Sequence, residues 1–115
     1  MARVPAGTLL TVAPTGAETA KTDAPGLPVT VEELVATAMA CQAAGAAVIH
    51  VHLRDDEAQP TLDLGRARET IAGIRESTDL VVQISSGGAV TDSEDDRLAV
   101  LDSLPDGASL TCGTV

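Results

Sequence analysis

The sequence contains no phenylalanine, tyrosine or tryptophan. A surface that stacks nucleic-acid bases on aromatic rings is therefore excluded. The core must instead be built from alanine, valine, leucine and isoleucine, within an apolar content of 44%. Because no apolar run approaches the length of a membrane-spanning helix, we expect a soluble chain.

Basic residues and cysteines are also few. Seven lysines and arginines against 17 aspartates and glutamates give a formal net charge of −10, which repels phosphate backbones and anionic membranes. We therefore expect neither a nucleic-acid nor a membrane partner. Cys41 and Cys112 lack paired spacing and are predicted to be free packing residues in a reducing compartment. The chain start lacks the apolar stretch of a signal peptide, which favours a cytoplasmic protein.

Apolar runs with strand character alternate with helical patterns along the 115 residues. Strands are predicted at 8–15, 46–52, 80–85 and 108–112, and helices begin at the capping box 30–33, near Asp63 and at a second capping box, 91–94. Gly45 is predicted to end the first helix, and Leu98 and Leu101 to point inward from the third. This alternation is typical of an α/β fold with a parallel sheet.

Alternate residues of a strand point to opposite faces of the sheet, and the chemistry of the two faces distinguishes a doubly wound sheet from a barrel. One face is polar and the other is aliphatic, as in a barrel whose active site lies at the carboxyl ends of its strands. The polar set is Thr11, Thr15, His50, His52, Arg54, Gln83, Ser85, Ser109 and Thr111, and the aliphatic set is Leu10, Val12, Ile49, Val51, Val82, Ile84 and Leu110. A (β/α)8 TIM barrel needs about 250 residues. Residues 1–115 are therefore predicted to form one incomplete domain of about three and a half βα units, with unpaired edges on its first and fourth strands.

His50 and His52 are the only histidines in the chain. Their spacing places both imidazoles on one face of a strand, where they can form half of a metal site. Zinc is the natural ion for such a pair when a further ligand and solvent complete the site. The alternative is two ordinary hydrogen-bonded histidines at a strand end. The pair alone does not identify a reaction.

Four motifs occur in one order along the whole chain: Thr-Gly-Ala-Glu-Thr from Thr15, His-Val-His-Leu-Arg from His50, Gln-Ile-Ser-Ser-Gly-Gly-Ala-Val from Gln83, and Ala-Ser-Leu-Thr from Ala108. Together they resemble the N-terminal part of the β-keto acid cleavage enzyme family. The resemblance implies a zinc-dependent (β/α)8 barrel that reacts a β-keto acid with acetyl-CoA. The products would be acetoacetate and a new acyl-CoA.

The same resemblance implies roles for individual residues. His50 and His52 would be zinc ligands, and Ser85 and Ser109 would hold the carboxylate and keto end of the substrate. Ser109 departs from the threonine of similar family members but keeps the hydroxyl. Gly87 and Gly88 can present backbone N–H groups to an anion, although a plain glycine turn explains them equally well.

Glu18 limits which β-keto acid the resemblance implies as the substrate. In the matching family motif, a glutamate at this place pairs with an ammonium group of the substrate. The substrate would then be 3-keto-5-aminohexanoate, an intermediate of lysine degradation, and the acyl product 3-aminobutyryl-CoA. A surface glutamate in a flexible loop is the alternative. Arg54 can hold a carboxylate, but we expect it to pair structurally with Asp55, Asp56 or Glu57.

No catalytic residue is expected in this segment. The family's general base, an arginine and a third zinc ligand belong to its C-terminal half, so the isolated chain should bind zinc weakly and be inactive. A metal-dependent hydrolase barrel, in which the histidines activate water, is one alternative. Another is a non-catalytic half-barrel that acts through assembly, as a homo-oligomer or with a complementing C-terminal half.

Overall fold

The computed structural model describes residues 6–110. Within this range, four strands and three α-helices alternate, and a 3₁₀ helix, η1, precedes the last of these strands. The elements are β1 (Thr11–Val12), α1 (Val31–Ala43), β2 (Val48–Val51), α2 (Leu64–Ser77), β3 (Val81–Ile84), α3 (Glu94–Ala99), η1 (Val100–Ser103) and β4 (Gly107–Ala108). The strands form one parallel sheet in the order β1-β2-β3-β4. This confirms the predicted α/β class and agrees with the N-terminal part of a TIM-like barrel.

The helix starts follow from local sequence. Thr30 accepts a hydrogen bond from the Glu33 amide at 3.1 Å, and the Glu33 carboxylate accepts from the Thr30 amide at 3.1 Å. This reciprocal capping box confirms the first predicted helix start. Asp63 caps α2 by accepting from the Arg66 amide at 2.7 Å. The end of α1 is set by Gly45, whose φ of +104° suits only glycine.

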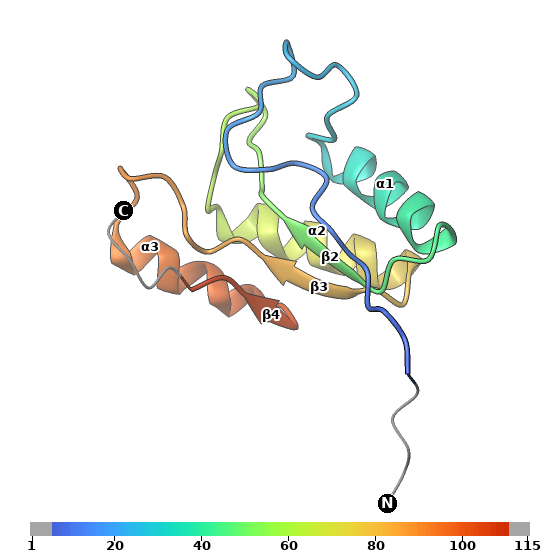
Figure 1. The fold of residues 1–115 in the computed structure, drawn as a ribbon. Helices are drawn as coiled ribbons and strands as arrows, with labels where there is room; N and C mark the ends of the chain where they lie inside the picture. Colours follow the sequence, from blue (N-terminus) through green and yellow to red (C-terminus); the bar gives the residue numbers. More distant parts are fainter. Residues whose placement is uncertain (1–5, 111–115) are drawn as a thin grey trace, which may run out of the picture.

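One face of the sheet is buried under α1 and α2. Ile49, Val51, Val82 and Ile84 are each 0% exposed and belong to one hydrophobic cluster. The helices contribute their apolar stripes to this cluster, with Leu34, Ala38, Ala67, Ile71 and Ile74. Figure 1 shows α2 lying behind β2 and β3. The aliphatic face predicted from parity is therefore the core of this domain.

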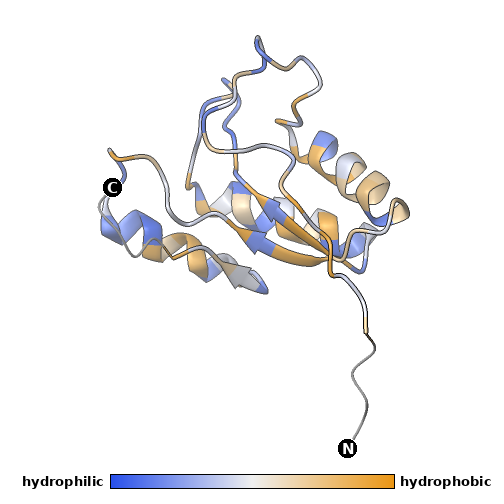
Figure 2. Ribbon diagram, viewed as in Figure 1, coloured by the Kyte–Doolittle hydropathy of each residue, from blue (hydrophilic) through white to orange (hydrophobic). Residues whose placement is uncertain are grey.

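The opposite face of the sheet is more polar and partly open. His50 pairs in register with Gln83, and both are half-buried, while Val81 is 44% exposed. Figure 2 shows β2 and β3 as mostly hydrophobic ribbons, each interrupted by a hydrophilic band. A barrel interior that further strands would enclose has this character.

The two outer strands are shorter than predicted. β1 covers two residues of the expected 8–15, and β4 covers Gly107–Ala108. Leu10 is 51% exposed and Leu110 85% exposed, so their predicted place in the aliphatic belt is wrong. The reason is that both residues lie beyond the ends of these short edge strands. Thr111 and Cys112, which were also assigned to the fourth strand, lie outside the described residues.

The third helix differs from its prediction in two ways. Its N-cap is Ser93, which accepts from the Asp96 amide at 3.1 Å, so the expected capping box at 91–94 does not form. Leu98 and Leu101 are 64% and 37% exposed, which contradicts their predicted inward position. The inward position is taken by Val100, which is 0% exposed.

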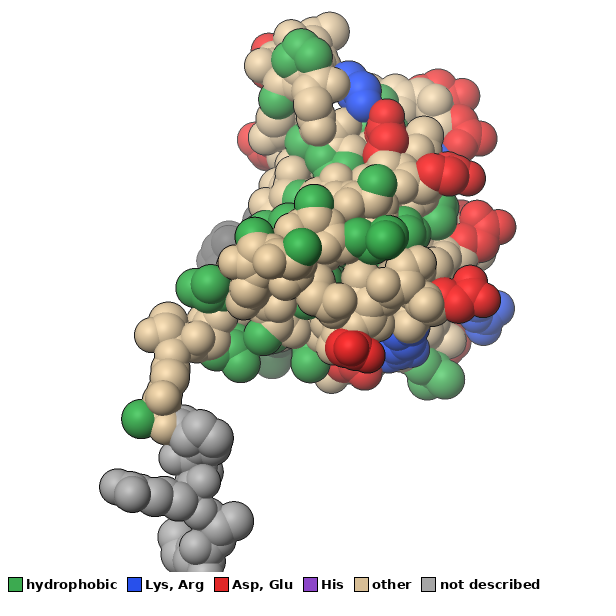
Figure 3. Space-filling model, turned by 90° about the vertical axis from the view of Figure 1, so that its right-hand side faces the viewer, with side chains coloured by type: hydrophobic (Ala, Val, Ile, Leu, Met, Phe, Trp, Pro, Cys, Tyr) green, Lys and Arg blue, Asp and Glu red, His purple; other side chains and the backbone are tan. Residues whose placement is uncertain are grey.

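The side of the molecule nearest α1 carries mixed surface chemistry. Figure 3 shows acidic side chains along one border of this side and hydrophobic ones gathered in its middle. Cys41 lies in α1, half-buried and free, as predicted. None of the helices within residues 6–110 is both long and apolar enough for a membrane crossing.

Candidate functional site

Three loops meet where the parallel strands end. The loops that follow β1, β2 and β3 lie at the same end of the sheet (Figure 1) because parallel strands point their carboxyl ends in one direction. They enclose a cavity of about 420 Å³, a size that suits a small-molecule ligand. Its lining includes Glu18, His52, Arg54, Ser85 and Gly88. The other lining residues are Ala17, Leu53, Gln59, Pro60, Thr61, Leu62, Ala89, Val90 and Asp92.

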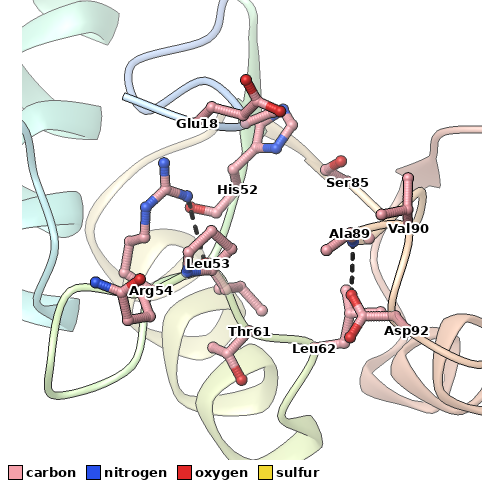
Figure 4. A pocket seen from close by; sticks show the side chains of 14 residues that line it. Glu18, His52, Leu53, Arg54, Thr61, Leu62, Ser85, Ala89, Val90 and Asp92 are labelled. Atoms are coloured by element: carbon pink, nitrogen blue, oxygen red, sulfur yellow. Dashed lines mark hydrogen bonds between the residues drawn. The ribbon is translucent and has the colours of Figure 1, made fainter. Parts of the chain in front are cut away.

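Four of the site residues predicted from sequence, Glu18, His52, Ser85 and Gly88, therefore share one cavity. In Figure 4, Glu18 and His52 form the upper rim, Ser85 lies to their right, and Ala89, Val90 and Asp92 line the wall opposite Arg54. Neither the Glu18 carboxylate nor the Ser85 hydroxyl hydrogen-bonds to another described residue. Both groups are consequently available to a ligand.

The two histidines lie on the same side of the sheet, as predicted. Their ring centroids are 5.1 Å apart and the rings are inclined at 71°. Two imidazoles that bind one tetrahedral zinc ion at about 2.0–2.1 Å have their centroids about 5 Å apart. The observed spacing thus fits two ligands of one ion, although His50 does not itself line the cavity.

Burial lowers the pKa of His52, and the nearby His50 and Arg54 lower it further. A lowered pKa favours the neutral imidazole, which is the form that binds a metal. Within residues 6–110, no group of three or more His, Cys, Asp or Glu side chains could hold an ion. The two histidines fit two of the three protein ligands that a catalytic zinc site usually has.

The two predicted substrate serines have different surroundings. Ser85 lines the cavity, but Ser109 does not. The Ser109 hydroxyl accepts from the Ser86 amide at 3.0 Å, and the Ser86 hydroxyl donates to the Ser109 carbonyl at 2.6 Å. This reciprocal pair fastens the ends of β3 and β4 together. Sequence reasoning missed Ser86, although a second hydroxyl beside Ser85 was a visible signal.

In the glycine turn after β3, a backbone amide is hydrogen-bonded to a carboxylate of the same chain. Gly88 lines the cavity, whereas Gly87 does not. Gly88 has a φ of +64°, and the Ala89 amide that follows donates to the Asp92 carboxylate at 2.6 Å. The amide that is already bound is therefore that of Ala89, next to the Gly87 and Gly88 amides to which the nest was assigned. Asp92 was assigned only to a helix start, so this contact was also missed.

Arg54 makes contacts that differ from those expected. It is 1% exposed, and its Nη2 lies 2.8 Å from the Gly16 carbonyl oxygen and 3.4 Å from that of Thr19. The expected pairing with Asp55, Asp56 or Glu57 is wrong, since Asp56 pairs with Arg66 at 2.6 Å. The parity of Arg54 turns its side chain toward the loop after β1 and away from the acidic turn.

The comparison with known families decides what this site belongs to. A model described as beta-keto acid cleavage enzyme matches residues 8–115. The chain belongs to the β-keto acid cleavage enzyme family. The resemblance drawn from the four motifs is thereby confirmed.

Curated relatives within this family support the same assignment. The chain is 42% identical over 107 residues to a 3-keto-5-aminohexanoate cleavage enzyme of Fusobacterium nucleatum, covering 92% of this chain and 39% of that protein. A protein of the same name from Acetoanaerobium sticklandii is 41% identical over 107 residues, with the same coverage. A 3-oxoadipate:acetyl-CoA acetyltransferase of Cupriavidus necator is 35% identical over 108 residues, covering 93% of this chain and 38% of that protein. The chain thus spans about two fifths of the length of these relatives.

Proposed function

We propose that this chain supplies the N-terminal half of a zinc-dependent site that cleaves 3-keto-5-aminohexanoate with acetyl-CoA. The products would be acetoacetate and 3-aminobutyryl-CoA. The observation that carries the proposal is the convergence of Glu18, His52 and Ser85 on one cavity, with His50 5.1 Å from His52 between ring centroids. The third zinc ligand and the general base belong to βα units beyond this incomplete domain, so the chain alone is expected to be inactive.

In this proposal the chain binds and orients the substrate. His50 and His52 hold the ion as neutral imidazoles, and bound zinc would supply the Lewis acidity that polarises a keto carbonyl. The Ser85 hydroxyl donates a hydrogen bond to the carboxylate or keto oxygen of the substrate. The aliphatic wall formed by Leu53 and Leu62 excludes water from the carbon chain.

Glu18 selects among β-keto acids by charge. Its carboxylate lines the cavity and has no ion-pair partner within residues 6–110, so it can accept a substrate ammonium. The same charge would repel the distal carboxylate of 3-oxoadipate. The two most similar relatives above are named for the amino substrate, which agrees with this choice.

The test uses what we term the joined protein. In it, this chain replaces the matching N-terminal 39% of the Fusobacterium nucleatum enzyme. We expect acetoacetate to form from 3-keto-5-aminohexanoate and acetyl-CoA, with a kcat/KM at least about tenfold above that for 3-oxoadipate, as expected for one charge contact. The unmodified relative serves as the control for assay and folding.

The Glu18→Gln variant of the joined protein identifies the contact. It should lose activity on 3-keto-5-aminohexanoate but keep activity on 3-oxohexanoate, which has the same length and no amino group. Equal losses on both substrates would contradict the ammonium role. A folded joined protein that prefers 3-oxoadipate would contradict the substrate assignment.

A further inference from the structure

Among the residues that the structure describes, Arg54 is a buried cation with no carboxylate partner. It is 1% exposed, and none of the ion pairs within residues 6–110 includes it. Its Nε is buried and has no hydrogen-bond partner in the described part of the chain. Burying a charge is costly, and an apolar side chain of similar volume is often as stable in such a place. The presence of an arginine here therefore calls for a role other than filling space.

The contacts of Arg54 point to the loop after β1. Its Nη2 donates to the carbonyls of Gly16 and Thr19, at 2.8 and 3.4 Å, which lie on either side of Ala17 and Glu18. Its Nη1 is 3.5 Å from the carbonyl oxygens of its neighbours in sequence, His52 and Leu53. Although Arg54 contributes to the cavity wall, its terminal nitrogens are directed at backbone oxygens.

A second contact joins the same two segments. The Thr15 hydroxyl, on a residue 2% exposed, accepts from the His52 amide at 3.0 Å. Gly16 then adopts a φ of +64°, which turns its carbonyl in a way that other residues rarely permit. Glu18 itself is exposed and makes no hydrogen bond within the described residues. Its position thus depends on how the backbone on either side of it is held.

We propose that Arg54 is a positioning residue that fixes the 16–19 loop against the end of β2 and so holds Glu18 at the rim of the cavity. Through Glu18 it sets the preference for a β-keto acid that carries an ammonium group. This inference rests on the role given to Glu18 in the proposed function. Arg54 makes no contact with the substrate in this scheme.

The first test measures loop order in the 115-residue chain by amide hydrogen exchange. The His52 amide reports on the loop because it donates to Thr15, and the Ser85 amide, which donates to the Val51 carbonyl at 2.9 Å, reports on the sheet. We expect Arg54→Met to accelerate exchange at His52 by at least about tenfold and to leave Ser85 within about twofold. Unchanged exchange at His52 would overturn the proposal.

Arg66→Lys is the matched control for this test. Arg66 also donates to a backbone carbonyl, that of Arg54 at 2.9 Å, but it does not touch the 16–19 loop. Exchange at His52 should therefore stay as in the unmodified chain. Arg54→Lys keeps a cation that reaches one carbonyl, and it should restore part of the protection.

The second test measures selectivity in the joined protein. The quantity is the ratio of kcat/KM for 3-keto-5-aminohexanoate to kcat/KM for 3-oxohexanoate. We expect Glu18→Gln to lower this ratio about tenfold to a hundredfold, and Arg54→Met to lower it by at least about fivefold. In the Glu18→Gln background, Arg54→Met should lower the ratio no further, because it acts through Glu18.

The outcomes separate this inference from the proposed function. If Glu18→Gln leaves the ratio unchanged, the ammonium role fails, and the role of Arg54 fails with it. If Glu18→Gln lowers the ratio but Arg54→Met reduces both activities equally, Arg54 binds a group common to both substrates, and only this inference is overturned. The hydrogen-exchange measurement tests whether Arg54 holds the 16–19 loop, and its result does not depend on the activity of the joined protein.

Discussion

The two faces of the sheet differ in whether the elements of this chain cover them. The face under α1 and α2 is complete within this chain, since Ile49, Val51, Val82 and Ile84 have no exposed surface. The opposite face carries His50 and Gln83 and leaves Val81 44% exposed. The covered face stabilises the domain, and the open face carries the residues that we propose for the site. In this proposal, stability and activity depend on alternate residues of the same strands.

The largest expected effect is loss of zinc binding on the open face. His52→Ala in the 115-residue chain should weaken zinc affinity by more than about a hundredfold, because one imidazole alone remains. Titration against a chromophoric chelator measures this. Gln83→Ala, which changes the residue paired with His50 in register, should leave zinc affinity unchanged. Equal affinities for His52→Ala and the unmodified chain would refute the metal site.

Two neighbouring valines on β3 allow the contributions of the two faces to stability to be compared directly. Val82 is 0% exposed and Val81 is 44% exposed. We expect Val82→Ala to lower the free energy of unfolding by about 2 kcal/mol, through lost burial and a cavity, and Val81→Ala by less than about 0.5 kcal/mol. Urea denaturation of both variants gives the comparison. Similar losses would show that the open face is packed as tightly as the covered one.

Glu33, at the start of α1, makes the stability of the covered side depend on pH. Hydrogen bonds from the Val29 amide, Lys21 and the Thr30 amide lower the pKa of Glu33 from its ordinary 4.5 to about 2. The stabilisation is therefore fully present above pH 4.5 and is lost as pH falls from 4.5 toward 2. Glu33→Gln should unfold at lower urea concentration than the unmodified chain near neutral pH, and this difference should shrink toward pH 2.

Glu32→Gln is the control for this titration. Glu32 lies on the same helical turn and makes no side-chain hydrogen bond within the described residues. Because its replacement removes no hydrogen bond of the helix start, Glu32→Gln should unfold at the same urea concentration as the unmodified chain near neutral pH. A constant difference between Glu33→Gln and the unmodified chain across this pH range would contradict the assignment.

The smallest expected effect concerns α3. Leu98 is 64% exposed, so Leu98→Ser should change the free energy of unfolding of this chain by less than about 0.5 kcal/mol. In the joined protein, where further βα units are present, a larger loss would identify α3 as part of their packing surface. Thermal unfolding of both proteins provides the measurement. A loss above about 1 kcal/mol in the chain alone would show that Leu98 is already packed.

Local sequence signals predicted most of the fold. The Thr30 to Glu33 capping box, Gly45 and the alternation within β2 and β3 each act over a few residues, so they can be read without the tertiary structure. The edge strands were overestimated because their length depends on partners. The inward position of Leu98 failed for a similar reason, since a helical pattern does not show which part of a helix finds a neighbour.

The candidate site was predicted only in part. The strand period placed His50 and His52 together, and the family motifs brought Glu18 and Ser85 to the same cavity. The partners of Arg54 could not be predicted in this way. They are two backbone carbonyls on a loop some 35 residues earlier, and a side-chain pattern carries no information about the direction of backbone carbonyls. The Asp92 contact with Ala89 is likewise a property of loop conformation.

The turn after β3 limits how this pocket can be altered by mutation. A Cβ on Gly88 would lie 2.6 Å from the Asp92 carboxylate, in a backbone conformation that side chains rarely adopt. Replacing Asp92 removes the closest contact, but the Leu62 side chain at 3.0 Å and the backbone conformation still oppose a Cβ at this position. Val90, which is 80% exposed, is therefore open to substitution, whereas Gly88 and Asp92 must be kept together.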